Sequence, residues 1–141
     1  MTITTERTAM LPWDVQTVWQ VVTGVEGYPA WRRDLLRAEI LNEKQFLEHT
    51  PGGVQTLCTV TAAEPCRRWA FDLKNPNLTG HWMGRFTAQG AGTQVTFRET
   101  VTLKKVIPRP LVWGYLKRQQ ARFLADLERA LAQEGNGGGK P

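Results

Sequence analysis

Two polar side chains fall at positions where the surrounding pattern calls for apolar ones. Glu99 shares one face of an alternating, strand-like run with Val95, Phe97, Val101 and Leu103. Gln120 lies in the middle of the apolar stripe of a long, helix-like segment. Burial raises the pKa of a carboxyl group, and near neutral pH such a group can give or take a proton. Glu99 and Gln120 are therefore candidates for ligand recognition or for acid–base chemistry.

Each of these residues also has a purely structural interpretation. A bulge or a cavity mouth would let the Glu99 carboxylate reach water or an arginine. A buried amide without partners costs on the order of 1–3 kcal/mol, so Gln120 must bond another buried polar group, or water or a ligand in a cavity. The sequence leaves these alternatives open.

The remaining residue types exclude several other kinds of site. The chain contains no serine, which excludes every serine nucleophile. Cys58 and Cys66 are too far apart for a CxxC motif, and the only histidines are His49 and His81. Four such scattered side chains predict no metal site, and we expect neither a metal nor another cofactor. The two cysteines are expected to be free thiols in a reducing compartment.

Positive charge is concentrated in one part of the chain. The net charge is +5, and the stretch from Lys104 to Arg122 holds six basic residues and no acidic one. Arg118, Arg122 and Arg129 project from a helix face opposite the apolar stripe, as expected of a solvated face. Nucleic-acid binding would need exposed aromatic residues among the basic ones, so we do not expect it. Docking of this basic helix on an acidic partner or a membrane surface is kept as an alternative.

Length and composition predict a single domain. The chain has 141 residues, of which 41% are hydrophobic and 22% charged. This is enough for one core, and no segment approaches the ~20 apolar residues of a membrane span. The polar start predicts no secretory leader, which places the protein in the cytoplasm. We expect one domain over residues 1–134 and a flexible, glycine-rich tail over residues 135–141.

Periodicity predicts the elements that must position the candidate residues. Apolar residues at helical spacing follow Asp14, a short helical turn is expected at 28–31, and a closing helix at 111–133. The strand-like runs cover residues 3–11, 35–41, 45–48, 54–62, 68–74, 78–88 and 93–104. Short connections rich in Gly, Pro and Asn separate the last six, so consecutive strands should pair antiparallel. Alternation turns most of the six tryptophans toward one interior, which is either a filled aromatic core or a cavity lined by aromatic residues.

The order of these elements resembles a known superfamily. The residues that carry the resemblance are Pro12 with Val15, Val18 and Trp19, then Tyr28-Pro29-Ala30-Trp31, the run 92–97 and the closing segment 116–131. Together they resemble START-like (SRPBCC) proteins, specifically the polyketide cyclase/dehydrase and lipid-transport family. The resemblance implies an α+β helix-grip fold. In this fold a bent antiparallel sheet wraps around a long C-terminal helix, two short helices follow the first strand, and an apolar cavity remains inside.

The preferred function is binding of a small hydrophobic ligand, of the lipid, polyketide or aromatic type, between the sheet and the C-terminal helix. The residues expected to bind it are Trp31, Phe71, Trp82, Phe86, Phe97, Glu99, Trp113, Leu116, Gln120 and Phe123. The alternative is an enzyme that resembles the polyketide cyclases and dehydrases, with Glu99 as its acid or base. A third hypothesis is the docking of the basic helix described above.

Overall fold

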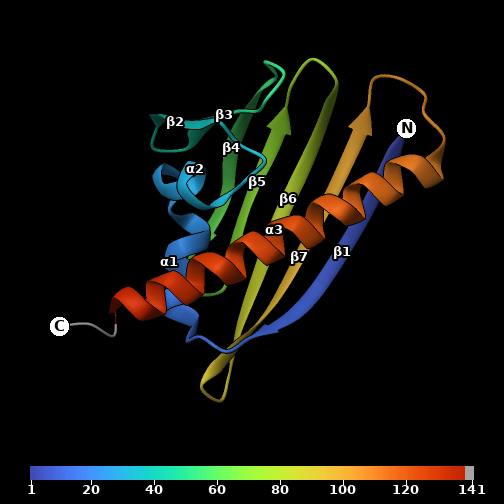
Figure 1. Cartoon of the computed structure of the whole chain (residues 1–141). Coiled ribbons are helices and arrows are strands. Elements are labelled where there is room, and N and C mark those ends of the chain that lie inside the picture. Colours follow the sequence, from blue (N-terminus) through green and yellow to red (C-terminus); the bar gives the residue numbers. More distant parts are fainter. Residues whose placement is uncertain (139–141) are drawn as a thin grey trace.

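The chain folds into one curved antiparallel sheet that holds a long helix against its concave face (Figure 1). The structure is a computed structural model and describes residues 1–138. Its elements are β1 (Thr2–Leu11), α1 (Val15–Thr23), the 3-10 turn η1 (Val25–Gly27), α2 (Tyr28–Trp31), β2 (Arg37–Asn42), β3 (Gln45–His49), β4 (Gln55–Glu64), β5 (Arg68–Lys74), β6 (Leu78–Gln89), β7 (Gly92–Leu103) and α3 (Arg109–Gly138). The strand order β1-β7-β6-β5-β4-β3-β2 joins every strand to its neighbour in sequence except β1, which pairs with β7. The predicted helix-grip fold is confirmed.

The two faces of the sheet are separated by strand alternation. On the outer face, threonine hydroxyls of β1 and β7 are bonded in the pairs Thr2–Thr102, Thr4–Thr100 and Thr8–Thr96. β-branched residues favour the extended backbone, and such cross-strand pairs stabilise it. The inner positions of β7 are apolar and buried at Val95, Phe97 and Val101. Glu99 follows the same alternation and is the polar exception on this inner face.

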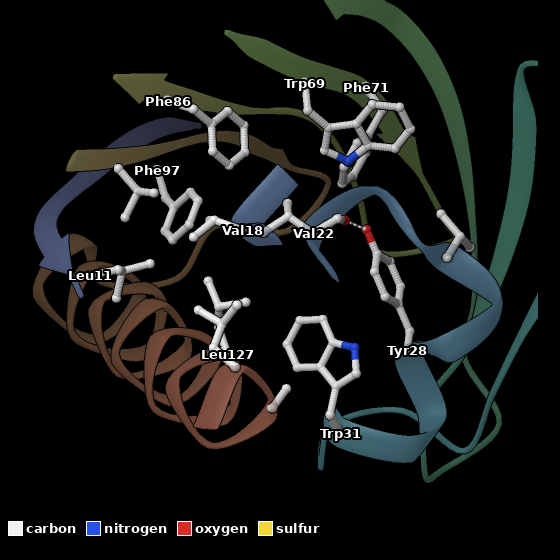
Figure 2. Close-up of a cluster of buried hydrophobic side chains, with 14 of the residues drawn as sticks. Leu11, Val18, Val22, Tyr28, Trp31, Trp69, Phe71, Phe86, Phe97 and Leu127 are labelled. Carbon is white, nitrogen blue, oxygen red and sulfur yellow. Dashed lines mark hydrogen bonds between the residues drawn. The ribbon is translucent and has the colours of Figure 1, made fainter. Parts of the chain in front are cut away.

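The short helices close one end of the interior. Asp14 caps α1 by accepting a hydrogen bond from the backbone N–H of Thr17 at 3.3 Å. Val18 and Val22 of α1 are fully buried, and the Tyr28 hydroxyl of α2 donates to the Val22 carbonyl (Figure 2). This end of the fold is therefore fixed by packing and by a buried hydrogen bond.

α3 crosses the concave face of the sheet and is tied to it by polar contacts (Figure 1). Its buried residues follow helical spacing, at Val112, Leu116, Gln120, Leu127 and Leu131, with half-buried Phe123 between Gln120 and Leu127. Asp126 is fully buried, and its carboxylate accepts hydrogen bonds from the Arg33 backbone N–H at 3.0 Å and from Arg33 Nε at 2.6 Å. The bonds join α3 to the segment between α2 and β2.

The closing helix is longer than predicted. It covers residues 109–138, whereas the apolar pattern predicts 111–133. The prediction relied on the usual role of glycine in ending a helix. Helical hydrogen bonds join backbone groups, so they continue into a glycine-rich run without any apolar stripe to mark them. The last three residues of the predicted tail, 139–141, lie outside the described residues.

The interior contains both a filled core and a cavity. In the filled part, the Trp19 ring lies edge-on to those of Trp69 and Phe86, with centroids 6.4 Å and 5.3 Å away. Figure 2 shows Trp31 between Tyr28 of α2 and Leu127 of α3. A second, smaller cluster of Ile3, Val101, Val112 and Leu116 packs β1 and β7 against the start of α3. The inward aromatic residues therefore form a filled core in one part of the interior and line a cavity in another.

Candidate functional site

A cavity of about 320 Å³ lies between the inner face of the sheet and α3. This volume is within the range of pockets that hold small organic molecules. Its apolar wall consists of Phe71, Leu73, Trp82, Phe97, Val101, Leu116 and Phe123. These residues come from β5, β6, β7 and α3, so the wall depends on the curvature of the sheet around the helix.

Stacked aromatic rings form the floor of the cavity. The Trp82 ring is stacked between Phe71 and Phe97, at centroid distances of 5.2 Å and 5.3 Å. Phe123 of α3 contacts Trp82 and Phe97 edge-on. The Trp82 ring lies over Gly84, where an added Cβ would be 3.0 Å from its far edge. Glycine at 84 therefore leaves the space in which the Trp82 ring lies parallel to its neighbours.

A charged cluster lines the cavity near α2. Arg32 Nη2 donates to Asp34 Oδ2 at 2.7 Å, and Nη1 donates to Glu48 Oε2 at 2.8 Å. The guanidinium also lies over the rings of Tyr28 and Phe123, at 5.0 Å and 5.4 Å from their centroids. Burial alone would lower the pKa of Arg32, but the Glu48 and Asp34 carboxylates raise it, and the guanidinium stays charged. Arg32 is thus already paired with two carboxylates.

Glu99 faces the cavity from β7. In the sheet it lies opposite Thr5 of β1 and Trp82 of β6. The pKa of its carboxyl group is raised to about 7, mainly by burial and also by the Glu48 and Asp34 carboxylates, while the Arg32 charge opposes them. Within the described residues, no side chain or backbone group hydrogen-bonds this carboxyl group. Glu99 is therefore a half-buried acid that faces the cavity and whose charge changes near neutral pH.

Gln120 faces the same cavity from α3. Its Nε2 donates to the backbone carbonyl oxygens of Thr5 at 3.1 Å and of Phe97 at 3.4 Å. Its Oε1 is buried and has no hydrogen-bond partner among the described residues. The amide nitrogen of Gln120 therefore has the buried polar partners that the sequence predicts, whereas its amide oxygen has none among the described residues.

The cavity brings together seven of the ten residues predicted to bind a ligand. These are Phe71, Trp82, Phe97, Glu99, Leu116, Gln120 and Phe123. Trp31 and Phe86 point inward but do not line the cavity, because Trp31 packs on Tyr28 and Phe86 on Trp19 in the filled core.

The inward placement of Trp113 was wrong. Its side chain is 53% exposed, and Lys117 Nζ lies 5.9 Å from the centroid of its ring. Successive helix residues are about 100° apart, and Val112 takes the inward position. Trp113 is therefore on the surface of α3, away from the cavity.

The charged cluster is the part of the site that the sequence analysis missed. Arg32 and Asp34 lie in an irregular segment after α2, where no periodicity shows which way a side chain points. Glu48 gave a usable signal, because it shares the inner face of β3 with buried Phe46. The same alternation that identified Glu99 would have identified Glu48.

The other groups capable of chemistry lie elsewhere. His49 is 3.3 Å from Glu39 and His81 is 2.8 Å from Asp72, and neither histidine lines the cavity. Among the side chains of residues 1–133, which the structure describes, no three from His, Cys, Asp or Glu come together as metal ligands. None of the helices in this part of the chain has the length and apolar character needed to cross a membrane. The cavity is therefore the candidate functional site in the described part of the chain.

Comparisons with known proteins agree with this architecture. A family model described as polyketide cyclase / dehydrase and lipid transport matches residues 2–132. Comparison with curated proteins gives no match. A START superfamily protein from Mycobacterium smegmatis has 15% identity and a TM-score of 0.87, covering 92% of this chain and 97% of its own. The Zhui aromatase/cyclase from Streptomyces sp. R1128 has 15% identity and a TM-score of 0.86, covering 99% of each chain. At such identities the likeness to these structures shows the fold alone.

Proposed function

Since the chain belongs to the polyketide cyclase / dehydrase and lipid transport family, we propose that it binds a small, largely aromatic molecule in the cavity between the sheet and α3. The observation that carries this proposal is the stacked wall of Phe71, Trp82 and Phe97 beside a space of about 320 Å³. Apolar surface buried against such a wall contributes roughly 25 cal/mol per Å². Rings held in place by stacking lose little freedom when a ligand arrives.

The polar groups of the cavity favour an uncharged ligand with a hydrogen-bond donor. Gln120 Oε1 is a free acceptor, and the Glu99 carboxylate accepts hydrogen bonds when it is ionised. Arg32 would have to give up Asp34 or Glu48 to bind an anion. Separating a buried ion pair is costly, so an anionic head group is disfavoured. A hydroxyl group on an aromatic ring satisfies these conditions.

Three two-ring probes test this proposal: 2-naphthol, 2-methoxynaphthalene and 2-naphthoate. We expect 2-naphthol to bind one to one and to change the fluorescence of Trp82. Loss of one hydrogen bond should weaken 2-methoxynaphthalene about fivefold, and 2-naphthoate should bind more weakly still. The Trp82→Phe variant should lose the fluorescence change, whereas Trp113→Phe, which alters an exposed tryptophan outside the cavity, should keep it. Equal or tighter binding of 2-naphthoate would contradict the proposed ligand class, and no binding of any probe would contradict the proposed function.

A second candidate function is acid–base catalysis by Glu99. The observation that favours it is a carboxyl group with a pKa of about 7 facing an aromatic-walled cavity. A group that titrates near the working pH is suited to proton transfer in an aldol-type ring closure or a dehydration. Turnover of a polyketide-like substrate should then follow a pKa near 7 and be lost in Glu99→Gln. A protein that only binds would show no turnover in either form.

We also place the protein in the cytoplasm, on the state of its cysteines. Cys58 and Cys66 are free thiols, and burial raises the pKa of the Cys58 thiol. Free thiols persist in a reducing compartment. Fractionation of cells that express the chain tests this placement: the protein should be in the cytoplasmic fraction, and a thiol-labelling reagent should modify its cysteines there.

A further inference from the structure

Exposed apolar residues lie close together in sequence where β7 passes into α3. Five large hydrophobic residues there are exposed within a stretch of ten, which is a denser group than elsewhere in the described chain. They are Val106, Ile107, Leu111, Trp113 and Tyr115, and we call them the β7–α3 patch. Val106 is 94% exposed and Leu111 66% exposed. Groups of exposed apolar residues of this kind mark contact surfaces.

The charged residues in the stretch of chain that contains the β7–α3 patch are all positive. The stretch from Lys104 to Arg122 contains six basic residues and no acidic one. Arg109 and Lys117 donate hydrogen bonds to backbone carbonyl oxygens of β1, at Thr2 and Glu6. Lys104 and Lys105 are exposed, and no acidic side chain pairs with either of them in the described part of the chain. The patch therefore presents apolar residues with unneutralised positive charge beside them.

The β7–α3 patch borders the mouth of the cavity. Tyr115 belongs to the patch and also lines the cavity. Thr50 and Val54, around the β3–β4 connection, and Asn75 and Asn77, in the β5–β6 connection, line it as well. Figure 1 shows the β3–β4, β5–β6 and β7–α3 connections at the same end of the molecule. A surface that contacts the patch thus lies beside the route into the cavity.

We propose that the β7–α3 patch docks on an anionic lipid membrane and holds the cavity mouth against the bilayer. The patch combines the features of an interfacial anchor: single apolar side chains at a connection, a Trp and a Tyr, and neighbouring lysines. Basic residues near an anionic surface strengthen binding by about fivefold each. An acidic protein would match the charge but would leave the highly exposed Val106 and Leu111 without an apolar environment. The docking can be tested apart from the ligand-binding proposal, since Lys104, Lys105 and Leu111 do not line the cavity.

Vesicle sedimentation tests the docking. The full chain should bind phosphatidylcholine–phosphatidylglycerol vesicles, bind pure phosphatidylcholine vesicles far less, and bind the mixed vesicles more weakly as salt rises. The double variant Lys104→Gln/Lys105→Gln should weaken binding to the mixed vesicles by on the order of tenfold or more. Lys44→Gln, which removes an exposed charge on the β2–β3 connection, should leave vesicle binding unchanged.

The apolar contribution has a matched control. Leu111→Ser should weaken vesicle binding severalfold, whereas Leu36→Ser, at a leucine that is 67% exposed outside the patch, should have no effect. Lipids brominated in their acyl chains should quench the fluorescence of Trp113, and Trp113→Phe should abolish that quenching. Absence of vesicle binding, equal effects of the two leucine variants, or binding to polyglutamate but not to vesicles would overturn the proposal. Binding of 2-naphthol by Leu111→Ser shows separately whether the cavity is intact.

Discussion

The Glu99→Gln substitution should change how the stability of the protein depends on pH. In the folded protein the Glu99 pKa is about 7, because burial disfavours its charge, and its ordinary value is 4.5. Between these two values the folded state holds a proton that the unfolded state has released. The free energy of unfolding therefore falls as pH rises from about 4.5 to about 7, and the contribution is constant outside that window.

The size of this effect follows from the two pKa values. At about 1.4 kcal/mol per pH unit, the difference between 4.5 and about 7 corresponds to at most about 3 kcal/mol. The carboxyl group faces a cavity that admits water, which reduces the penalty, so we expect about 1–3 kcal/mol. Glutamine keeps the shape of the side chain and carries no charge. The variant should therefore lack this loss of stability.

Urea unfolding from about pH 4 to about pH 9 measures this difference directly. The stability of Glu99→Gln relative to the unsubstituted protein should rise by about 1–3 kcal/mol across the window, with its midpoint about halfway between the unfolded and folded pKa values. Glu43→Gln, at an exposed position, serves as the control and should show no such rise. If the difference between Glu99→Gln and the unsubstituted protein does not vary with pH, Glu99 is solvated in the folded state and the reasoning about its burial is refuted.

Three further substitutions have defined outcomes. Gln120→Leu should weaken 2-naphthol binding about fivefold. It should change the free energy of unfolding by less than about 1 kcal/mol, because it removes both the amide hydrogen bonds and the unpartnered Oε1. Equal weakening of 2-methoxynaphthalene binding would contradict the role of Oε1 as the acceptor. Gly84→Ala should displace the Trp82 ring and cost about 1–3 kcal/mol, seen as a changed near-UV circular dichroism spectrum; an unchanged spectrum would show that the ring has room. Asp126→Asn should cost about 1–3 kcal/mol by neutralising the buried partner of Arg33, measured by urea unfolding; no loss would mean that the hydrogen bonds matter and the charge does not.

Most of the fold could be predicted from the sequence because its strands are long and their connections short. The run predicted at 68–74 coincides with β5, and the run at 45–48 differs from β3 by one residue. Alternation also gave the inward placement of Glu99 and Trp82, since a strand side chain must point to one face or the other. Helix faces were predicted less well. The stripe on α3 was assigned correctly from Leu116 onward, but Trp113 at its edge lies on the surface.

The charged half of the site could not be predicted, because it depends on contacts between distant segments. Arg32 meets Glu48 across 16 residues, and only the packing of α2 beside β3 brings them together. The division of the aromatic residues into a filled core and a cavity wall has the same origin. Trp82 and Phe86 share one face of β6, yet only Trp82 lines the cavity, since α1 covers Phe86 through Trp19. Alternation gives the face of a strand and does not give what covers each position along it.

The placement of the two polar exceptions supports the proposal that the cavity binds a ligand. Glu99 lowers stability relative to an apolar side chain of similar size through its poorly solvated charge, and Gln120 leaves its buried Oε1 without a hydrogen-bond partner among the described residues. They come from different elements, β7 and α3, and face the same space beside the stacked wall of Trp82. Independent defects would have no reason to converge, whereas groups that recognise one ligand must. Departures from the pattern of the rest of the chain that gather at one cavity are what a functional site produces, because recognition requires polar groups where stability alone would favour apolar ones.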